Sequence, residues 1–184
     1  MTNMKYISSR ISSYGWSDIV YVEFETSIYW FIKSLPGVLG YVLRYLYFKL
    51  FLKSLKSFCW IQPNVTILYA KYMKVGKNLA INTNTYINAM GEIEIGDNVL
   101  IGPNVVISSG YHQYKDVTIP INHQKIGRKN ITIENDVWIG ANVVIMPGVK
   151  ISSGCVIGAG SVVTKSTNEN QIVVGVPARV MGKR

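Results

Sequence analysis

The pattern of aliphatic and polar positions is most regular between residues 133 and 168, where it repeats every six residues. Written in sixes, this stretch reads IENDVW, IGANVV, IMPGVK, ISSGCV, IGAGSV and VTKSTN. Each unit opens on a β-branched aliphatic residue, and these are Ile133, Ile139, Ile145, Ile151, Ile157 and Val163. Because the period is even, the first and fifth residues of a unit point the same way from an extended chain. The Gly, Asn and Pro between them bend it. A fixed period of six is typical of a parallel β-helix.

The same period extends upstream, and its irregularities predict three units per turn. First positions fall at Ile61, Ile67, Val75, Ile81, Ile87, Ile95, Ile101 and Ile107. If three units form one triangular turn, the short insertions after Ile67 and Ile87 and the long insertion 108–132 all leave from one corner. We therefore predict a mainly β fold, with a β-helix over residues 61–168 that carries a loop insertion at 108–132. The handedness of the coil does not follow from the spacing, since ordinary crossover sterics favour right-handed connections.

Residues 1–60 lack this period and predict an N-terminal helical segment, from about Ser27 to Ser57 with a break at Pro36. The part from 38 to 58 is apolar, and on a helix its three lysines gather on one side, at Lys49, Lys53 and Lys56. Charges this frequent argue against a transmembrane span. Such a basic amphipathic helix either lies on an anionic membrane surface or packs on the first coil or a neighbouring subunit. Both interpretations stay open.

Composition sets looser bounds. A chain of 184 residues is long enough for one domain with a sizeable core and a small appendage. Its net charge of +9 suits a nucleic acid, a membrane surface or an anionic small ligand. Two cysteines do not make a disulfide framework, and Cys155 falls among the small fifth positions of the repeat, where it should pack. No secretory signal pattern opens the sequence, so we expect a cytoplasmic location.

Four segments resemble the hexapeptide-repeat acyltransferases, in the branch of sugar and polysaccharide O-acetyltransferases that includes maltose and galactoside acetyltransferases. They are IGDNVLIGPNVVI, DVWIGANVVIMPGVKI, GAGSVVTK and VVGVPARV, and the resemblance covers about residues 61–181. It implies a left-handed parallel β-helix, a homotrimer, acetyl-CoA as donor, and active sites in clefts between subunits. Residues 169–184 would then be a C-terminal tail that completes the CoA site. The implied acceptor is a hydroxyl of a sugar or polysaccharide precursor.

Acetyl transfer to an alcohol needs a base, and neutral imidazole is suited to that near pH 7. The two histidines, His112 and His123, both lie in the long insertion. His112, in SSGYHQY, stands where the family has its general base, so the resemblance implies a catalytic role. His123, in PINHQKI, matches no family motif, and its ordinary interpretation is a solvated side chain.

The resemblance also implies contacts to the acceptor or acyl group. Asn84, in INTNTYI, matches a family asparagine that contacts one of them, although Asn is also a residue type that tolerates corner conformations. The family often carries an acceptor-binding Asp shortly afterwards, and this chain has Ala89 there. The acceptor contacts therefore stay open.

For the donor, the resemblance implies small residues along the pantetheine arm and polar or basic residues near the phosphates and nucleotide. The first set is Ala141, Ala159 and Gly160, and the second is Thr164, Lys165 and Arg179. Basic side chains beside a polyanion are chemically sensible, while a solvated basic C-terminus is the plainer alternative. Gly182 replaces a further basic residue of the family, for which Lys183 or Arg184 would substitute. Trp138 either walls the CoA cleft or packs under the loop.

Other functions of a β-helix fit less well. A carbonic anhydrase would need three histidines to hold zinc, and with two we expect no metal. The basic residues form neither a stripe nor a known nucleic-acid module, so we expect no nucleic acid. A non-enzymatic scaffold and an N-acetyltransferase of an amino sugar stay as alternatives.

Overall fold

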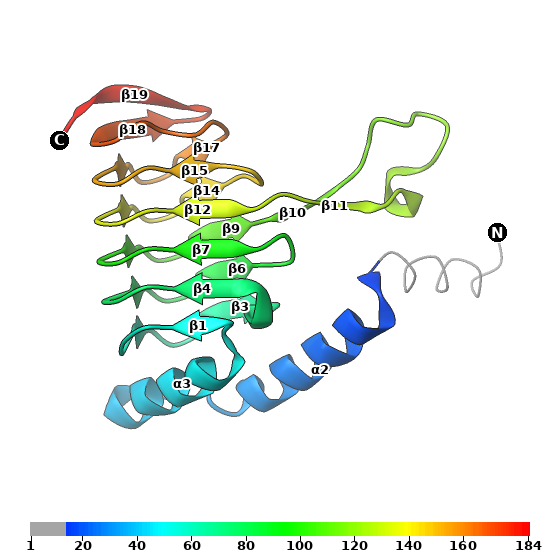
Figure 1. The fold of residues 1–184 in the computed structure, drawn as a ribbon, viewed down its shortest axis with the longest axis vertical. Coiled ribbons are helices and arrows are strands. Elements are labelled where there is room, and N and C mark those ends of the chain that lie inside the picture. Colours follow the sequence, from blue (N-terminus) through cyan, green and yellow to red (C-terminus); the bar gives the residue numbers. More distant parts are fainter. Residues whose placement is uncertain (1–13) are drawn as a thin grey trace.

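The computed structural model describes residues 14–184, which fold into a parallel β-helix with helices at its base (Figure 1). Its coils build three parallel sheets, here called faces A, B and C. Face A contains β1 (Ser54–Leu55), β4 (Met73–Val75), β7 (Ile93–Ile95), β12 (Ile131–Ile133) and β15 (Lys150–Ile151). Face B contains β2 (Trp60–Ile61), β5 (Ala80–Ile81), β8 (Leu100–Ile101), β13 (Trp138–Ile139), β16 (Val156–Ile157) and β18 (Gln171–Gly175). Face C contains β3 (Thr66–Leu68), β6 (Tyr86–Asn88), β9 (Val106–Ser108), β14 (Val144–Ile145) and β17 (Val162–Val163).

The coil is left-handed, as the family resemblance implied. In Figure 1 the strands of face A run from right to left in front of the other faces, while the chain climbs from bottom to top. The register confirms three units per turn, because first positions three units apart pair on neighbouring strands. On face A these partners are Val75, Ile95, Ile133 and Ile151. Their side chains and the small fifth positions, Cys155 among them, are buried and fill the prism.

The corner between faces B and C is built from one conformation repeated at every level. Asn64, Asn84, Asn104 and Asn142 each adopt a left-handed backbone, with φ between 56° and 62°. Gly160 takes the same place in the last coil, with φ 71°. Few residues other than Gly and Asn adopt this conformation readily, which explains why the sequence has them here.

The corner between faces C and A takes all the insertions, as predicted. The long one leaves after β9 and returns at β12, and it begins as an antiparallel ribbon of β10 (Gly110–His112) and β11 (Ile126–Arg128). A short 3₁₀ helix, η2 (Ile121–His123), lies in the loop beyond. Residues 109–130, which we call the arm, project away from the coils in Figure 1.

The N-terminal segment contains α2 (Trp16–Trp30) and α3 (Gly37–Phe51). Figure 1 shows α3 across the base of the coils and α2 slanting from there towards the arm. Pro36 and Gly37 separate the two helices, as predicted. The expected start at Ser27 was wrong, since α2 already begins at Trp16. Apolar residues such as Ile19, Val20 and Val22 lie on several sides of this helix, so no single apolar side marked its start.

The expected end of the second helix was also wrong. After Phe51 the chain turns into β1, and the amide of Lys56 donates to the carbonyl of Val75 at 3.2 Å. Lys53 and Lys56 therefore do not share a helical side with Lys49. Because β1 pairs with β4, the first coil begins at Ser54 rather than near Ile61.

A buried arginine locks α3 to the coils. Arg44 is fully buried, and its Nε donates to the carbonyl of Ile61 at 2.8 Å. Its Nη1 donates to the carbonyl of Leu35 at 2.7 Å, at the turn between the helices. These bonds to main-chain oxygens join the helical turn to strand β2.

The C-terminal residues extend face B. β18 pairs in parallel with β16, and β19 (Ala178–Lys183) then returns antiparallel to β18. The turn between them contains a cis Val176–Pro177 peptide bond. The tail therefore closes the last coil at the end opposite to the helices.

Candidate active site

Four of the predicted site residues lie at the B–C corner. Asn84, Ala141, Ala159 and Gly160 all follow a strand of face B and precede one of face C. The coils stack closely here, since a Cβ on Gly140 would lie 2.7 Å from the amide nitrogen of Ala159. Ala159 and Gly160 are exposed, so this edge presents main chain that small side chains leave open to a ligand.

The backbone of Asn84 forms part of the corner turn, and its side chain is exposed. Its φ of 58° is that of the equivalent asparagines in other coils. Oγ1 of Thr83 donates to Oδ1 of Asn84 at 3.4 Å, a long contact within the corner itself. A structural role is thus established for the main chain, and the exposed side-chain amide is available for a substrate.

His112 lies at the end of strand β10 in the arm, opposite Ile126 in the register, and its side chain is exposed. A cavity of about 560 Å³ lies against the same strand, and Tyr111 and Gln113 are among its lining residues. Since neighbouring residues of a strand point to opposite sides, His112 faces away from this cavity. Its imidazole is open to approach from outside the arm.

The chain does not bring His112 and Asn84 together. His112 leaves from the C–A corner, whereas Asn84, Ala141 and Gly160 lie at the B–C corner, with face C between them. Both corners run the length of the prism, so they stay on separate edges at every level. A site that uses both needs a second corner from another subunit.

The predicted phosphate contacts converge in part. Lys165 and Arg179 line one cavity of about 160 Å³ at the C-terminal end of the coils, together with Thr167 and Val173. Thr164 is exposed next to Lys165 but is not among the lining residues. Two cationic side chains around one apolar-floored cavity suit an anionic group.

Lys183 and Arg184, considered as substitutes for Gly182, are not among the residues that line this cavity. Arg184 donates from Nη1 to Oδ2 of Asp136 at 2.8 Å, which ties it to the A–B corner. Lys183 is the register partner of Gln171, at the same end of the ribbon. A role of Lys183 or Arg184 in place of Gly182 therefore stays a prediction.

Trp138 lies in an exposed apolar column on face B. It is 55 % exposed, and its strand neighbour Leu100 is 53 % exposed. Trp60, on the same face, is 55 % exposed. The arm leaves from the C–A corner, so Trp138 does not pack under it. This column is typical of a surface that another chain covers.

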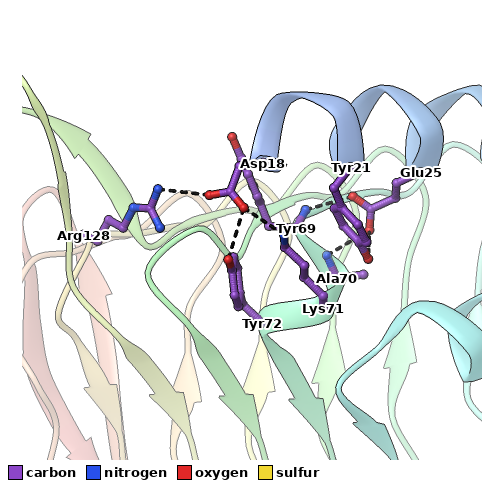
Figure 2. A network of polar contacts seen from close by, with 8 residues as sticks. All are labelled: Asp18, Tyr21, Glu25, Tyr69, Ala70, Lys71, Tyr72 and Arg128. Atoms are coloured by element: carbon purple, nitrogen blue, oxygen red, sulfur yellow. Dashed lines mark hydrogen bonds and ion pairs between the residues drawn. The ribbon is translucent and has the colours of Figure 1, made fainter. Parts of the chain in front are cut away.

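A polar cluster at the base of the arm escaped the sequence analysis (Figure 2). Asp18 of α2 accepts from Nζ of Lys71 at 2.8 Å, from the hydroxyl of Tyr72 at 3.1 Å and from Nη2 of Arg128 at 3.2 Å. Lys71 and Tyr72 belong to the C–A corner of the first coil, in η1 (Ala70–Tyr72), and Arg128 belongs to β11. One carboxylate therefore joins α2, the first coil and the arm.

The surroundings of Asp18 stabilise its ionised form. Burial raises the pKa of Asp18, but the hydrogen bond and ion pair with Lys71, aided by Tyr72 and Arg128, outweigh it and hold the pKa below its ordinary value. Glu25, two turns along α2, accepts from the amides of Tyr69 and Ala70. Burial raises the pKa of Glu25 despite these bonds. The signal in the sequence for this cluster was the spacing of Asp18 and Glu25, which lie seven residues apart and therefore on one side of a helix.

Among residues 14–184, no group of three or more His, Cys, Asp or Glu side chains is placed to hold a metal ion. Over the same range, no helix is long and apolar enough to cross a membrane.

Comparisons with known proteins agree with this geometry. The family model described as bacterial transferase hexapeptide (six repeats) matches residues 130–165, and the hexapeptide repeat of succinyl-transferase matches residues 92–110. A galactoside O-acetyltransferase of Escherichia coli (strain K12) is 43 % identical over 129 residues, which are 66 % of this chain and 59 % of that protein. The chain thus spans less than two thirds of this curated relative.

Two solved structures are similar over most of their length. A maltose O-acetyltransferase from Clostridium difficile 630 has a TM-score of 0.86 at 30 % identity, covering 93 % of this chain and 90 % of that one. A galactoside acetyltransferase in complex with coenzyme A has a TM-score of 0.83 at 32 % identity, covering 92 % of this chain and 83 % of that one.

Proposed function

We propose that this chain, which belongs to the hexapeptide-repeat acyltransferases, transfers an acetyl group from acetyl-CoA to a hydroxyl of a sugar or polysaccharide precursor. The observation that carries the proposal is the exposed His112 at the root of an arm, on a β-helix similar to two sugar O-acetyltransferases. In this position the imidazole of His112 is accessible to a substrate that binds along the coils.

His112 acts as the general base in direct transfer. Its imidazole nitrogen takes the proton of the acceptor hydroxyl as the oxygen attacks the thioester carbonyl. The new C–O bond forms, the C–S bond breaks, and the departing thiolate takes the proton from the imidazolium. The side-chain amide of Asn84 donates a hydrogen bond to the acyl oxygen or to the acceptor, where it stabilises developing negative charge.

The donor lies along the B–C corner. Ala141, Ala159 and Gly160 leave room there for the pantetheine arm, and Lys165 and Arg179 meet the phosphates at the C-terminal end. Thr164, exposed beside Lys165, offers a hydroxyl to the nucleotide. The fit rests on two properties of the chain, the close stacking of small residues at the corner and the cationic cavity at the C-terminal end of the coils.

The enzyme works as a homotrimer. Faces B and C flank the B–C corner, and their outward residues are largely apolar, for example Trp138 on B and Val106 on C. The outward residues of face A are charged, for example Lys74 and Glu94. Covering B and C with neighbours buries apolar surface and brings the arm of one chain to the B–C corner of the next.

A panel of acceptors tests whether the enzyme acetylates hydroxyls or amines. Sugars, nucleotide sugars and their amino counterparts are each incubated with acetyl-CoA, and the acetylated products are identified. Products on hydroxyls support the proposal, and products on amines alone favour an N-acetyltransferase.

The role of His112 is tested with two matched variants, His112→Ala and His123→Ala. The first should lower kcat by about 10²- to 10⁴-fold with little change in CoA affinity, and the second much less. Equal small losses would remove His112 from its role.

Binding of CoA separates an enzyme from a scaffold. A ligand that binds only the folded state raises its melting temperature, by about 2.7 kcal/mol of stability at a concentration of 100 Kd. Saturating CoA should therefore shift the unfolding transition upwards. An unchanged transition, together with no transfer on the panel, would leave the scaffold as the better interpretation.

The location follows from the donor. Acetyl-CoA is available in the cytoplasm, and the buried free thiols of Cys59 and Cys155 suit a reducing compartment. Peripheral contact of residues 38–58 with a membrane stays a prediction at this level, because the transfer reaction does not require it.

A further inference from the structure

The two N-terminal helices bury charged as well as aromatic residues and leave apolar residues exposed. They bury three charged residues, Asp18, Glu25 and Arg44, against the coils. On the opposite side they expose an apolar stripe at spacings of three and four residues. The stripe consists of Trp16, Val20, Phe24 and Ile28 on α2 and of Leu39, Val42, Leu46 and Leu50 on α3. We call these eight residues the apolar helix surface.

The exposure of this surface is too large to be incidental. Each of the eight side chains is between 40 % and 80 % exposed, and they continue along both helices. Single exposed apolar residues are ordinary, but a contiguous apolar patch at helical spacing marks a binding surface. The face towards the coils already has its partners, so this one faces outwards from the base of the prism.

Exposed basic side chains outnumber exposed acidic ones near this surface. Between residues 26 and 91 the sequence has eight Lys and Arg and no Asp or Glu, although Arg44 is buried and Lys71 and Lys74 pair with Asp18 and Glu94. Lys49 lies beside the stripe on α3, and Lys56 is exposed just after β1. Lys53 is exposed too, although it pairs with Glu92 at 3.4 Å. Glu23 is the single exposed acidic residue on the two helices.

We propose that the apolar helix surface docks on a lipid bilayer with anionic headgroups, with the stripe in the acyl boundary and the lysines at the phosphates. Apolar residues on one helix face with Lys beside them are the pattern of interfacial helices. Trp16 is suited to the headgroup level. A symmetric contact with a second copy would instead bring together two surfaces that both carry more basic than acidic side chains, which like charge disfavours.

The surface lies at the end of the prism opposite to β19, where Lys165 and Arg179 line their cavity. Docking therefore leaves that end of the molecule free. In a trimer with parallel prisms, three copies of the surface would face the same way. Weak single contacts would then add up to appreciable binding.

The test is co-sedimentation of the full chain with vesicles of phosphatidylglycerol and phosphatidylcholine, scored without acetyl-CoA so that it does not depend on catalysis. The wild type should be retained at low salt and released as salt rises. The double variant Leu46→Gln/Leu50→Gln should partition at least about tenfold less, since each buried Leu carries about that factor or more. Lys49→Gln should lower retention about fivefold.

Val117→Gln is the matched control, because Val117 is 95 % exposed, lies in the arm and is not part of the apolar helix surface. It should bind like the wild type. All variants should keep the melting temperature of the wild type within a few degrees, as surface substitutions do. Retention that is absent at low salt, or that survives Leu46→Gln/Leu50→Gln, would overturn the proposal. So would an assembly larger than a trimer that the same double variant dissolves, since the surface would then bind protein.

Discussion

Replacing Asp18 by alanine should loosen the joint between α2, the first coil and the arm. The carboxylate accepts at 2.8, 3.1 and 3.2 Å, and its side chain is 9 % exposed. Hydrogen bonds to a charged group contribute about 1.5–3 kcal/mol each. The partners Lys71 and Arg128 are 29 % and 39 % exposed, so they regain water when the carboxylate is lost. We therefore expect a net loss of about 2–4 kcal/mol rather than the full sum.

Thermal unfolding measures this loss. For a chain of this size, 1 kcal/mol corresponds to about 2–4 °C, so Asp18→Ala should lower Tm by about 5–15 °C. Glu94→Ala is the control, because it removes an ion pair in which both side chains are about half exposed, with Lys74. Such surface pairs contribute about 0–1 kcal/mol. A double-mutant cycle with Arg128→Met should return a coupling of about 0.5–2 kcal/mol across the arm.

The pH dependence of the same variants has a defined sign. The pKa of Asp18 is lower in the folded state, so the stabilisation is present above the ordinary carboxyl range and is lost as pH falls through the folded pKa. The Tm gap between wild type and Asp18→Ala should hold at neutral pH and begin to narrow below about pH 4. A gap no larger than that of Glu94→Ala, no coupling to Arg128, or a gap that widens in acid would refute the reasoning.

Two further predictions concern the donor cavity and the buried arginine. The double variant Lys165→Gln/Arg179→Gln should raise KM for acetyl-CoA about tenfold or more. The control Lys77→Gln, at the A–B corner, should leave KM unchanged. Steady-state kinetics at constant salt measures both values. Arg44→Met should destabilise by about 1–3 kcal/mol, because it leaves the main-chain carbonyls of Leu35 and Ile61 without this donor. Lys49→Met on the exposed side should change Tm by no more than a few degrees.

The coils were predictable because their signal is repeated. Each turn needs an aliphatic residue at the first position of every unit and a turn residue at each corner, so Ile133, Ile139 and Ile145 and their equivalents fix the register many times over. The insertions after Ile67 and Ile87 then showed which corner carries the arm. A single misread unit would have been corrected by its neighbours.

The helices were harder because their packing contradicts the usual pattern. Sequence analysis expects the apolar side of a helix to face the core, whereas α2 turns Asp18 and Glu25 inwards and Phe24 outwards. The partners of those carboxylates lie 44 residues or more away in sequence, at Tyr69, Lys71 and Arg128. No local period can report contacts of that kind.

The candidate site was predictable residue by residue but not as an assembly. Asn84 and Ala141 share a corner because both follow a face B strand, which the spacing already required. The distance from His112 to the B–C corner depends on the face that lies between the two places in one chain. It also depends on how neighbouring subunits pack against each other. Only the three-dimensional coil places His112 on another edge of the same chain.

This separation of His112 from Asn84 leads to a test by subunit complementation. Asn84→Ala and His112→Ala should each be nearly inactive as homotrimers. If each site takes His112 from one chain and Asn84 from the next, co-expressed variants form some sites with both residues intact. With equal and random mixing, a site draws the right chain at each of its two positions half the time, so activity should return to about a quarter of the wild type. If one chain supplied both residues, no mixture would hold an intact site, and activity would stay at the level of the parents. Mixing His112→Ala with wild type instead should leave about half of the sites active on either model, which controls for expression and assembly.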